Sequence, residues 1–156
     1  MQITIVAVGM RLPSWVNQGV NEYIKRFPPE VNVQLSEVNP VKRNKSATRE
    51  KIIKQEADRI VIAIPKGSYI IVLDEHGKTQ RTTVFAKNMD SWMREGKNIA
   101  FIIGGADGIH EEIKKKANEL WSLSDFTLPH GLARVLLTEQ LYRAWTVIKK
   151  HPYHRE

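Results

Sequence analysis

Two spacings of apolar residues alternate along the chain. Apolar-rich runs predict strands at 2–8, 31–38, 68–74, 98–103 and 120–123, and the first of them, rich in β-branched residues and ended by Gly9, is expected to be buried. Between them, apolar residues recur every three to four positions, which predicts helices over about 14–27, 47–63, 82–96, 109–119 and 132–149. Apolar strands that alternate with helices indicate an α/β fold, a mostly parallel sheet with helices on both faces.

Turn residues refine these boundaries. Pro13-Ser14 opens the first helix and Pro28-Pro29 ends it, while Thr82 or Thr83 is expected to cap the helix that follows them. Glu75-His76-Gly77-Lys78 predicts a turn. Because no internal repeat or long linker divides the chain, we expect one domain over residues 1–156.

The carboxyl ends of the strands are where parallel sheets bind ligands, so the loops after Leu73, Ile103 and Leu123 are candidate sites. Residues 104–108 read Gly-Gly-Ala-Asp-Gly, and a glycine lets a ligand lie against bare backbone. The same glycines would serve equally in a simple strand-to-helix turn. Their spacing matches neither the dinucleotide fingerprint nor the Walker loop.

The next loop, residues 121–131, interleaves apolar side chains with hydroxyls and ends in Pro129. Such a loop can form the wall of an adenine-sized apolar slot while it offers backbone hydrogen bonds to a base edge. The alternative is an ordinary connection in which Asp125 or Thr127 forms a turn or a cap. Asp74 and Glu75 fit either a ribose-binding pair or a turn.

Composition excludes several classes of protein. The chain has no cysteine, which excludes disulfides, thiolate metal sites and a cysteine nucleophile. No apolar run approaches the roughly 20 residues of a membrane span. The first residues have no basic region typical of a signal peptide. We therefore expect a cytoplasmic protein without membrane contact.

The net charge of +7 comes from two segments. Residues 42–59 hold seven Lys or Arg against three acids, residues 134–156 hold five against two, and the other residues are balanced. Two local sites for phosphate are therefore expected, the first beginning in the basic loop, residues 39–46. Lys114-Lys115-Lys116, by contrast, is neutralised by nearby glutamates and is expected to be a solvated face.

Motifs spread over the whole chain resemble one family. They are Val6–Gly9, Ile103–Gly108, the run 123–130, the helical segment 134–145 and residues 151–156, His-Pro-Tyr-His-Arg-Glu, here called the tail. Together they resemble the ribosomal RNA large subunit methyltransferase H family, a small group within the SPOUT (α/β-knot) methyltransferases. Ala106-Asp107 departs from the Pro-acid pair of some members, which concerns only the shape of that turn.

The resemblance implies transfer of a methyl group from S-adenosylmethionine to N3 of a pseudouridine in 23S rRNA, in the large subunit or the assembled 70S ribosome. It also implies a homodimer, no metal, and a C-terminal trefoil knot, which periodicity does not predict. The residues that it assigns to the cofactor are Leu73, Gly104, Leu123, Ser124, Asp125, Phe126, Thr127 and Leu128.

The tail supplies the candidate catalytic residues. His154 can accept the proton that leaves N3, Arg155 can stabilise the developing charge, and Tyr153 offers a stacking face for a flipped base. The alternative is a frayed tail with a solvated histidine. The residues expected to contact rRNA phosphates are Lys42, Arg43, Lys45, Arg134 and Arg143.

The first and last helices carry more apolar residues than one sheet face readily covers, which favours a homodimer; the alternative is that all of them are core. In a dimer, the basic loop of one subunit is hypothesised to complete the site of the other. Two other functions stay open: a SPOUT methyltransferase that acts on tRNA, and a non-catalytic, ribosome-associated RNA-binding protein.

Overall fold

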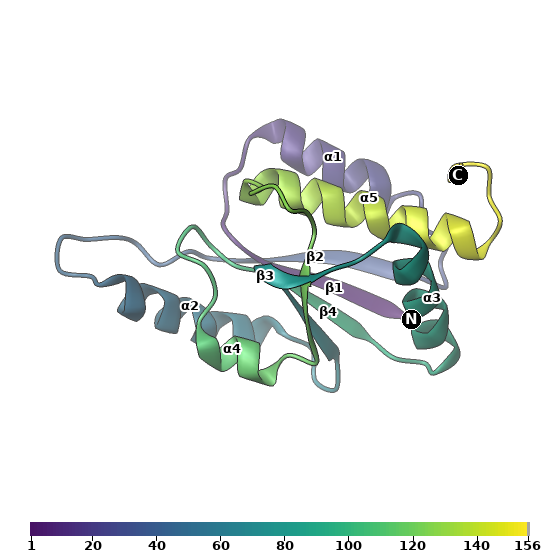
Figure 1. Ribbon diagram of the computed structural model, residues 1–156. Coiled ribbons are helices and arrows are strands. Elements are labelled where there is room, and N and C mark those ends of the chain that lie inside the picture. The colour runs from purple at the N-terminus through teal and green to yellow at the C-terminus, as the bar shows by residue number, and fades with distance from the viewer. Residues whose placement is uncertain (156) are drawn as a thin grey trace.

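The sheet of this protein is seen in a computed structural model that describes residues 1–155 (Figure 1). Its strands are β1 (Gln2–Val8), β2 (Asn32–Val38), β3 (Tyr69–Thr79), β4 (Ile99–Ile103) and β5 (Glu119–Ser122). Their order is β2-β1-β4-β3-β5, and every pairing is parallel. The predicted parallel sheet is confirmed.

Helices cover both faces of the sheet, as predicted (Figure 1). They are α1 (Ser14–Ile24), α2 (Arg49–Ala63), α3 (Thr82–Arg94), α4 (Glu111–Lys116) and α5 (His130–Ile148). α2 and α4 pack on one face, and α3 and α5 pack on the other, where α1 lies against α5. The C-terminal trefoil knot stays a prediction.

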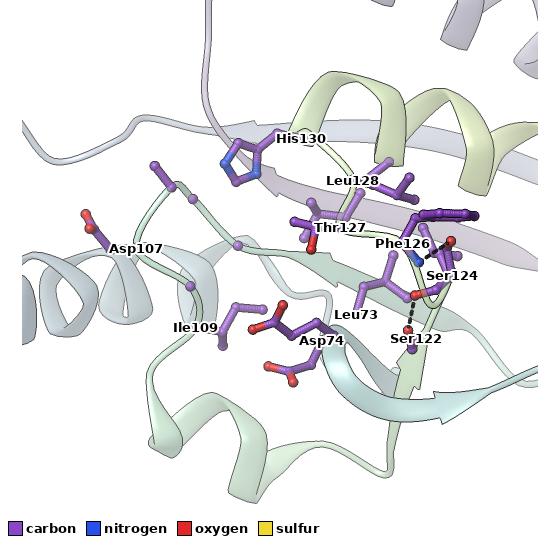
Figure 2. A pocket seen from close by; sticks show the side chains of 18 of the residues that line it. Leu73, Asp74, Asp107, Ile109, Ser122, Ser124, Phe126, Thr127, Leu128 and His130 are labelled. Carbon is purple, nitrogen blue, oxygen red and sulfur yellow. Dashed lines mark hydrogen bonds between the residues drawn. The ribbon is translucent and has the colours of Figure 1, made fainter.

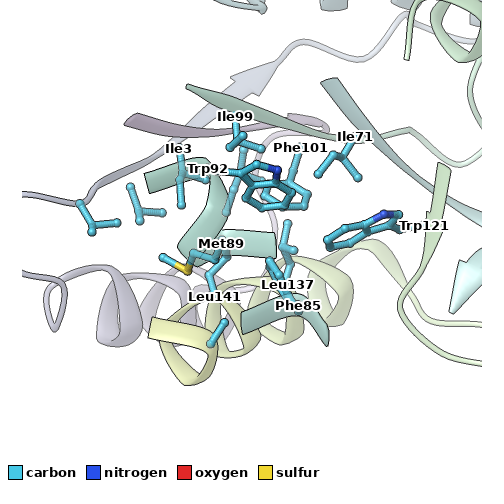
Figure 3. Close-up of a cluster of buried hydrophobic side chains, with 14 of the residues drawn as sticks. Ile3, Ile71, Phe85, Met89, Trp92, Ile99, Phe101, Trp121, Leu137 and Leu141 are labelled. Carbon is cyan, nitrogen blue, oxygen red and sulfur yellow. The ribbon is translucent and has the colours of Figure 1, made fainter. Parts of the chain in front are cut away.

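Aromatic side chains fill the core on the α3 and α5 side (Figure 3). The rings of Phe85, Trp92, Phe101 and Trp121 lie with centroids 5.0–6.4 Å apart, mostly edge to face, a geometry that adds to the gain from burial. The opposite face is aliphatic, with β-branched strand residues packed on α2 and α4. Burial on both faces explains why the central strands β1 and β4 are apolar almost throughout, whereas the edge strand β2 alternates apolar and polar residues.

Glu119 connects the edge strand β5 to β3. Its carboxylate accepts hydrogen bonds from the Tyr69 hydroxyl, at 2.8 Å, and from Trp121 Nε1, at 2.7 Å. Burial, together with the Glu119 carboxylate, raises the pKa of Tyr69 from 10.0 to about 12. The fold therefore favours the neutral phenol.

This pKa predicts an alkaline loss of stability. Because the folded state holds the proton of Tyr69 more tightly than the unfolded chain, its contribution is complete below pH 10 and is lost as the pH rises toward 12. Urea unfolding of the wild type and of Tyr69→Phe across pH 8 to 12 measures it. The stability advantage of the wild type should shrink only above pH 10, and an advantage that is constant to pH 12 would contradict the assignment.

Two local predictions were wrong. The expected turn at 75–78 is part of β3, whose pairing with β5 shifts in register between Leu73 and Lys78. Gly77 serves close approach, since a Cβ there would lie 2.5 Å from the Trp121 carbonyl carbon. Neither Thr82 nor Thr83 caps α3: Arg81 occupies the N-cap position without a side-chain bond, and the Thr82 hydroxyl donates to Gln140 Oε1 of α5 at 2.7 Å.

Candidate functional site

A pocket of about 300 Å³ lies at the carboxyl ends of β4 and β5 and beside the middle of β3, next to the loops that the sequence made candidates (Figure 2). We call it the sheet-edge pocket. It is lined by Arg49, Leu73, Asp74, Glu75, Ile103, Gly104, Gly105, Ala106, Asp107, Gly108, Ile109, Ser122, Leu123, Ser124, Phe126, Thr127, Leu128, His130 and Ala133. Seven of the eight residues predicted for the cofactor are therefore brought together. The exception is Asp125, which is exposed and is not part of the lining.

The Gly turn, residues 104–108, forms one wall of this pocket. It is closed by a 3.1 Å bond from the Gly108 amide to the Gly105 carbonyl, with Gly108 at a φ of +88°. A Cβ on Gly104 would lie 2.4 Å from Ile109 Cγ1 and 3.0 Å from the Gly108 carbonyl oxygen. The missing side chain thus lets Ile109 close against the strand, and Ile109 in turn lines the pocket.

The opposite wall, residues 122–128, is held by its own serines. Ser122 Oγ donates to the Ser124 carbonyl at 2.8 Å, and Ser124 Oγ accepts from the Phe126 amide at 2.9 Å (Figure 2). These bonds satisfy polar groups beside an apolar slot. The Phe126 ring is 85% exposed, at the rim.

Asp74 brings a fixed negative charge to the pocket. Its Oδ2 lies 2.8 Å from Lys114 Nζ, and its Oδ1 accepts from the His76 amide at 2.9 Å. Burial alone would raise the pKa of Asp74, but the Lys114 ammonium and the His76 amide hold it below its ordinary value. Lys114 is therefore part of the site's surroundings, and the expectation that it belongs to a purely solvated face was wrong.

The tail is ordered around Tyr153, far from this pocket in the same chain. The Tyr153 hydroxyl donates to Glu139 Oε1 at 3.0 Å, and the same oxygen accepts from Arg143 Nη2 at 2.6 Å. The ring of Tyr153 packs edge-on against Tyr142, with centroids 4.9 Å apart, and under the Arg143 guanidinium at 4.8 Å. Burial raises the pKa of Tyr153. Tyr153 thus anchors the tail in this structure.

His154 follows that anchor. Both of its ring nitrogens are buried and have no hydrogen-bond partner within residues 1–155. The frayed tail with a solvated histidine is therefore wrong. Because α5 rises about 1.5 Å per residue, Tyr142, where the tail docks, lies roughly 18 Å from His130 at the pocket. The remaining residue of the tail, Glu156, lies outside the described residues.

Arg134 does not belong to a phosphate-binding surface. Its side chain is 0% exposed; Nη1 donates to Glu37 Oε2 at 2.8 Å and Nη2 donates to the Gly9 carbonyl at 2.8 Å. A buried guanidinium that joins α5 to β1 and β2 cannot reach an RNA backbone, so this prediction was wrong. Its companion Arg143 is partly exposed but paired with Glu139.

The basic loop lies beside the pocket. Arg43 Nη2 lies 2.6 Å from Asp107 Oδ2 of the Gly turn, while Lys42 and Lys45 are exposed. The structure thus brings the predicted cofactor residues and the basic loop together at the sheet-edge pocket, whereas the tail of the same chain lies away from that pocket.

Three lining residues were not predicted for the pocket: Arg49, Ile109 and Ala133. Ile109 could have been found as the first apolar residue after the Gly turn, and Ala133 as a small residue in the first turn of the helix that follows Pro129. Arg49 had no such signal, because only the fold brings α2 to this edge.

No helix within residues 1–155 is long and apolar enough to cross a membrane. Within the same residues, no group of three or more His, Cys, Asp or Glu side chains is arranged to hold a metal ion.

Comparison with known proteins identifies the family. A family model described as "Predicted SPOUT methyltransferase" matches residues 1–154. Proteins named ribosomal RNA large subunit methyltransferase H from Ralstonia pickettii (strain 12J) and Herminiimonas arsenicoxydans are 51% and 47% identical over 155 residues, 99% of this chain and of each relative.

The fold has a solved counterpart. A probable methylase family protein from Haemophilus influenzae Rd KW20 superposes with a TM-score of 0.59 at 17% identity, over 99% of this chain and 70% of that one. With the match over nearly its full length, the chain belongs to the ribosomal RNA large subunit methyltransferase H family of the SPOUT methyltransferases.

Proposed function

We propose that this protein transfers a methyl group from S-adenosylmethionine to N3 of pseudouridine 1915 in 23S rRNA. The observation that carries the proposal is the sheet-edge pocket, in which the motif residues of the family converge on one cavity. Relatives about half identical over the whole chain, named for the large ribosomal subunit, support the substrate. Because the substrate is ribosomal, we place the protein in the cytoplasm.

The residues of the pocket fit the donor. Leu73, Ile109 and Leu128 offer apolar surface to an adenine ring and a thioether, in a cavity at the lower end of the range for ligand sites. The exposed Glu75 carboxylate stands where it would favour a cation such as a sulfonium, whereas the charge of Asp74 is balanced by Lys114. When bound, the donor supplies an activated methyl group with a neutral leaving group, so this chain needs no nucleophile of its own.

The remaining task is to orient the base and remove its proton. We assign proton acceptance to His154 and stabilisation of charge on the ring oxygens to Arg155. The buried, unpartnered nitrogens of His154 support this role, since a histidine without protein partners is free to bond a ligand once the tail is engaged. Tyr153 anchors the tail through Glu139 and is assigned that role rather than stacking.

The position of the tail supports a homodimer. Because the tail docks near Tyr142 of its own chain, away from the pocket at His130, we propose that the tail of a second subunit completes the pocket. Trp15 and Leu132 are exposed apolar residues on adjoining helix ends, since Gly131 packs against Val16. They offer the surface for association.

Light scattering at micromolar protein should give the dimer mass, and a monomer mass would remove this part of the proposal.

Mixed dimers test the shared site. One subunit carries His154→Ala and the other carries Gly104→Ala. Each homodimer should be inactive, whereas the mixed dimer pairs an intact pocket with an intact tail of the other chain and should regain about half of the wild-type activity, since one of two sites is whole. His154→Ala alone should keep its affinity for S-adenosylhomocysteine. No rescue in the mixed dimer would place the tail and the pocket of one site in the same chain.

Binding of rRNA is assigned to the exposed cations of the basic loop, Lys42, Arg43 and Lys45, together with Arg143. The basic loop lies next to the sheet-edge pocket, which suits a substrate whose base must enter that pocket.

The experiment that tests the function is mass spectrometry of 23S rRNA from a strain that lacks this protein. The proposed methyl group on pseudouridine should disappear and should return with the wild-type gene but not with His154→Ala. Unchanged rRNA methylation would refute the proposal, and loss of a methyl group from tRNA instead would identify the other substrate class.

A further inference from the structure

Asp107 is held by two arginines, Arg43 of the basic loop and Arg49, the first residue of α2. Its carboxylate lies 2.6 Å from Arg43 Nη2, and its backbone carbonyl accepts from Arg49 Nη2 at 2.9 Å and from Arg49 Nε at 3.2 Å. Asp107 belongs to the Gly turn and lines the sheet-edge pocket. The Gly turn, one wall of the pocket, is therefore held in place by Arg43 of the basic loop and by Arg49 at the start of α2.

The two ties differ in strength and in access. Arg49 is the first residue of α2, and the Thr48 cap at the N-terminus of α2 fixes its backbone. The Arg49 side chain binds the backbone carbonyl of Asp107, which carries no charge that could change with pH. Arg43 lies in the irregular segment before α2, with a side chain that is 61% exposed against 17% for Asp107. Ion pairs with such exposed partners contribute little in water.

A phosphate can compete for Arg43. The guanidinium binds phosphate with two parallel hydrogen bonds, as it binds a carboxylate, and the neighbouring Lys42 and Lys45 form no ion pair within residues 1–155. An RNA backbone that approaches the basic loop thus meets three cations, of which Arg43 alone has a protein carboxylate to give up. When Arg43 turns to RNA, the Gly turn keeps only its tie to Arg49.

We propose that Asp107 couples RNA contact at the basic loop to the sheet-edge pocket. Arg49 is a positioning residue that keeps the Gly turn in place, and Arg43 exchanges Asp107 for an RNA phosphate, which loosens the wall and weakens the hold on the cofactor product. The inference rests on the proposed function, since it requires the pocket to bind S-adenosylhomocysteine. Thermodynamic linkage then makes the bound product weaken RNA binding by the same factor.

Calorimetry with S-adenosylhomocysteine, with and without saturating polyuridylate, tests the coupling. Polyuridylate suffices because the contact is with phosphate. In the wild type, we expect RNA to weaken product affinity about threefold, the range of an exposed ion pair. Arg43→Ala without RNA should already show this weaker affinity, and RNA should change it no further. Asp107→Asn should also show the weaker product affinity without RNA and no further change with RNA, although Arg43 remains available to bind RNA.

Two variants complete the design. Lys45→Ala is the matched control: it removes a cation of the same loop and lowers RNA affinity, but the threefold factor at saturation should persist. Arg49→Lys keeps the charge and loses the fork of donors, and should weaken product binding about tenfold even without RNA, as expected for lost charged hydrogen bonds.

The outcomes separate this inference from the function beneath it. If the wild type binds the product and RNA has no effect, or if Asp107→Asn and Arg43→Ala both keep the wild-type factor, the coupling is wrong while the function stands. If the wild type does not bind S-adenosylhomocysteine at all, the proposed function itself fails. Thermal melts of each variant establish that the measured proteins are folded.

Discussion

Replacing Gly104 by alanine should weaken the affinity for S-adenosylhomocysteine by up to about a hundredfold, because overpacking a well-packed site costs about 1–3 kcal/mol. The reason is geometric: the new Cβ would lie 2.4 Å from Ile109 Cγ1, a distance that real contacts do not show. Ile109 and the Gly turn must therefore shift, and both line the sheet-edge pocket. Calorimetry gives the affinity, and urea unfolding shows that the protein remains folded.

A compensating change tests that explanation. In Gly104→Ala with Ile109→Ala, the atom nearest to the new Cβ is gone, and the Gly108 carbonyl oxygen at 3.0 Å remains. The double variant should bind the product better than Gly104→Ala, a non-additivity typical of residues in contact. Wild-type affinity in Gly104→Ala, or a double variant weaker than both single ones, would show that Ile109 is not the point of conflict.

Replacing Arg134 by methionine should lower the free energy of unfolding by about 1–3 kcal/mol, because the Gly9 carbonyl and the partly exposed Glu37 carboxylate lose charged hydrogen bonds. The change leaves the Glu37 carboxylate and the Gly9 carbonyl without the guanidinium that now bonds both. Urea unfolding measures the loss. Lys149→Ala, an exposed cation at the end of the same helix, is the control and should change stability by less than about 0.5 kcal/mol.

This experiment also decides between two roles for Arg134. A variant with unchanged stability and weaker rRNA binding would restore the role in phosphate binding that the charge pattern predicted. A destabilised variant whose folded fraction binds RNA normally would establish that Arg134 joins α5 to the sheet.

The elements of the sheet could be read from the sequence because burial on both faces leaves a local trace. A strand such as β4, Ile99–Ile103, is apolar at every position, and the glycines that follow it mark its end. The polar run 75–78 was wrongly predicted to be a turn, because its strand structure depends on a contact that leaves no local trace in the sequence. It continues β3 because Gly77 allows the backbone to approach Trp121 of β5, a contact between residues far apart in sequence.

The candidate site was predictable to the extent that it follows strand ends. Leu73 lies near the end of one predicted strand, while Gly104 and residues 124–128 follow directly after two others. Together with Leu123, all of these residues but Asp125 line one pocket. Charge was a poorer guide, since a sequence does not reveal where a cation points. Arg134 and Arg43 look alike in the charge count, yet one is buried against Glu37 and the other is exposed beside Asp107.

The sequence by itself determined the alternation of strands and helices, the parallel sheet and the edge at which ligands bind, because hydrophobic periodicity and chain order are local properties. Only the tertiary structure decided what several of the charged and hydroxyl groups do, because their roles depend on partners that are 50 to 125 positions away. Asp107 holds Arg43 and Arg49, Glu119 holds Tyr69, and Arg134 holds Gly9. These contacts exist only after the chain has folded.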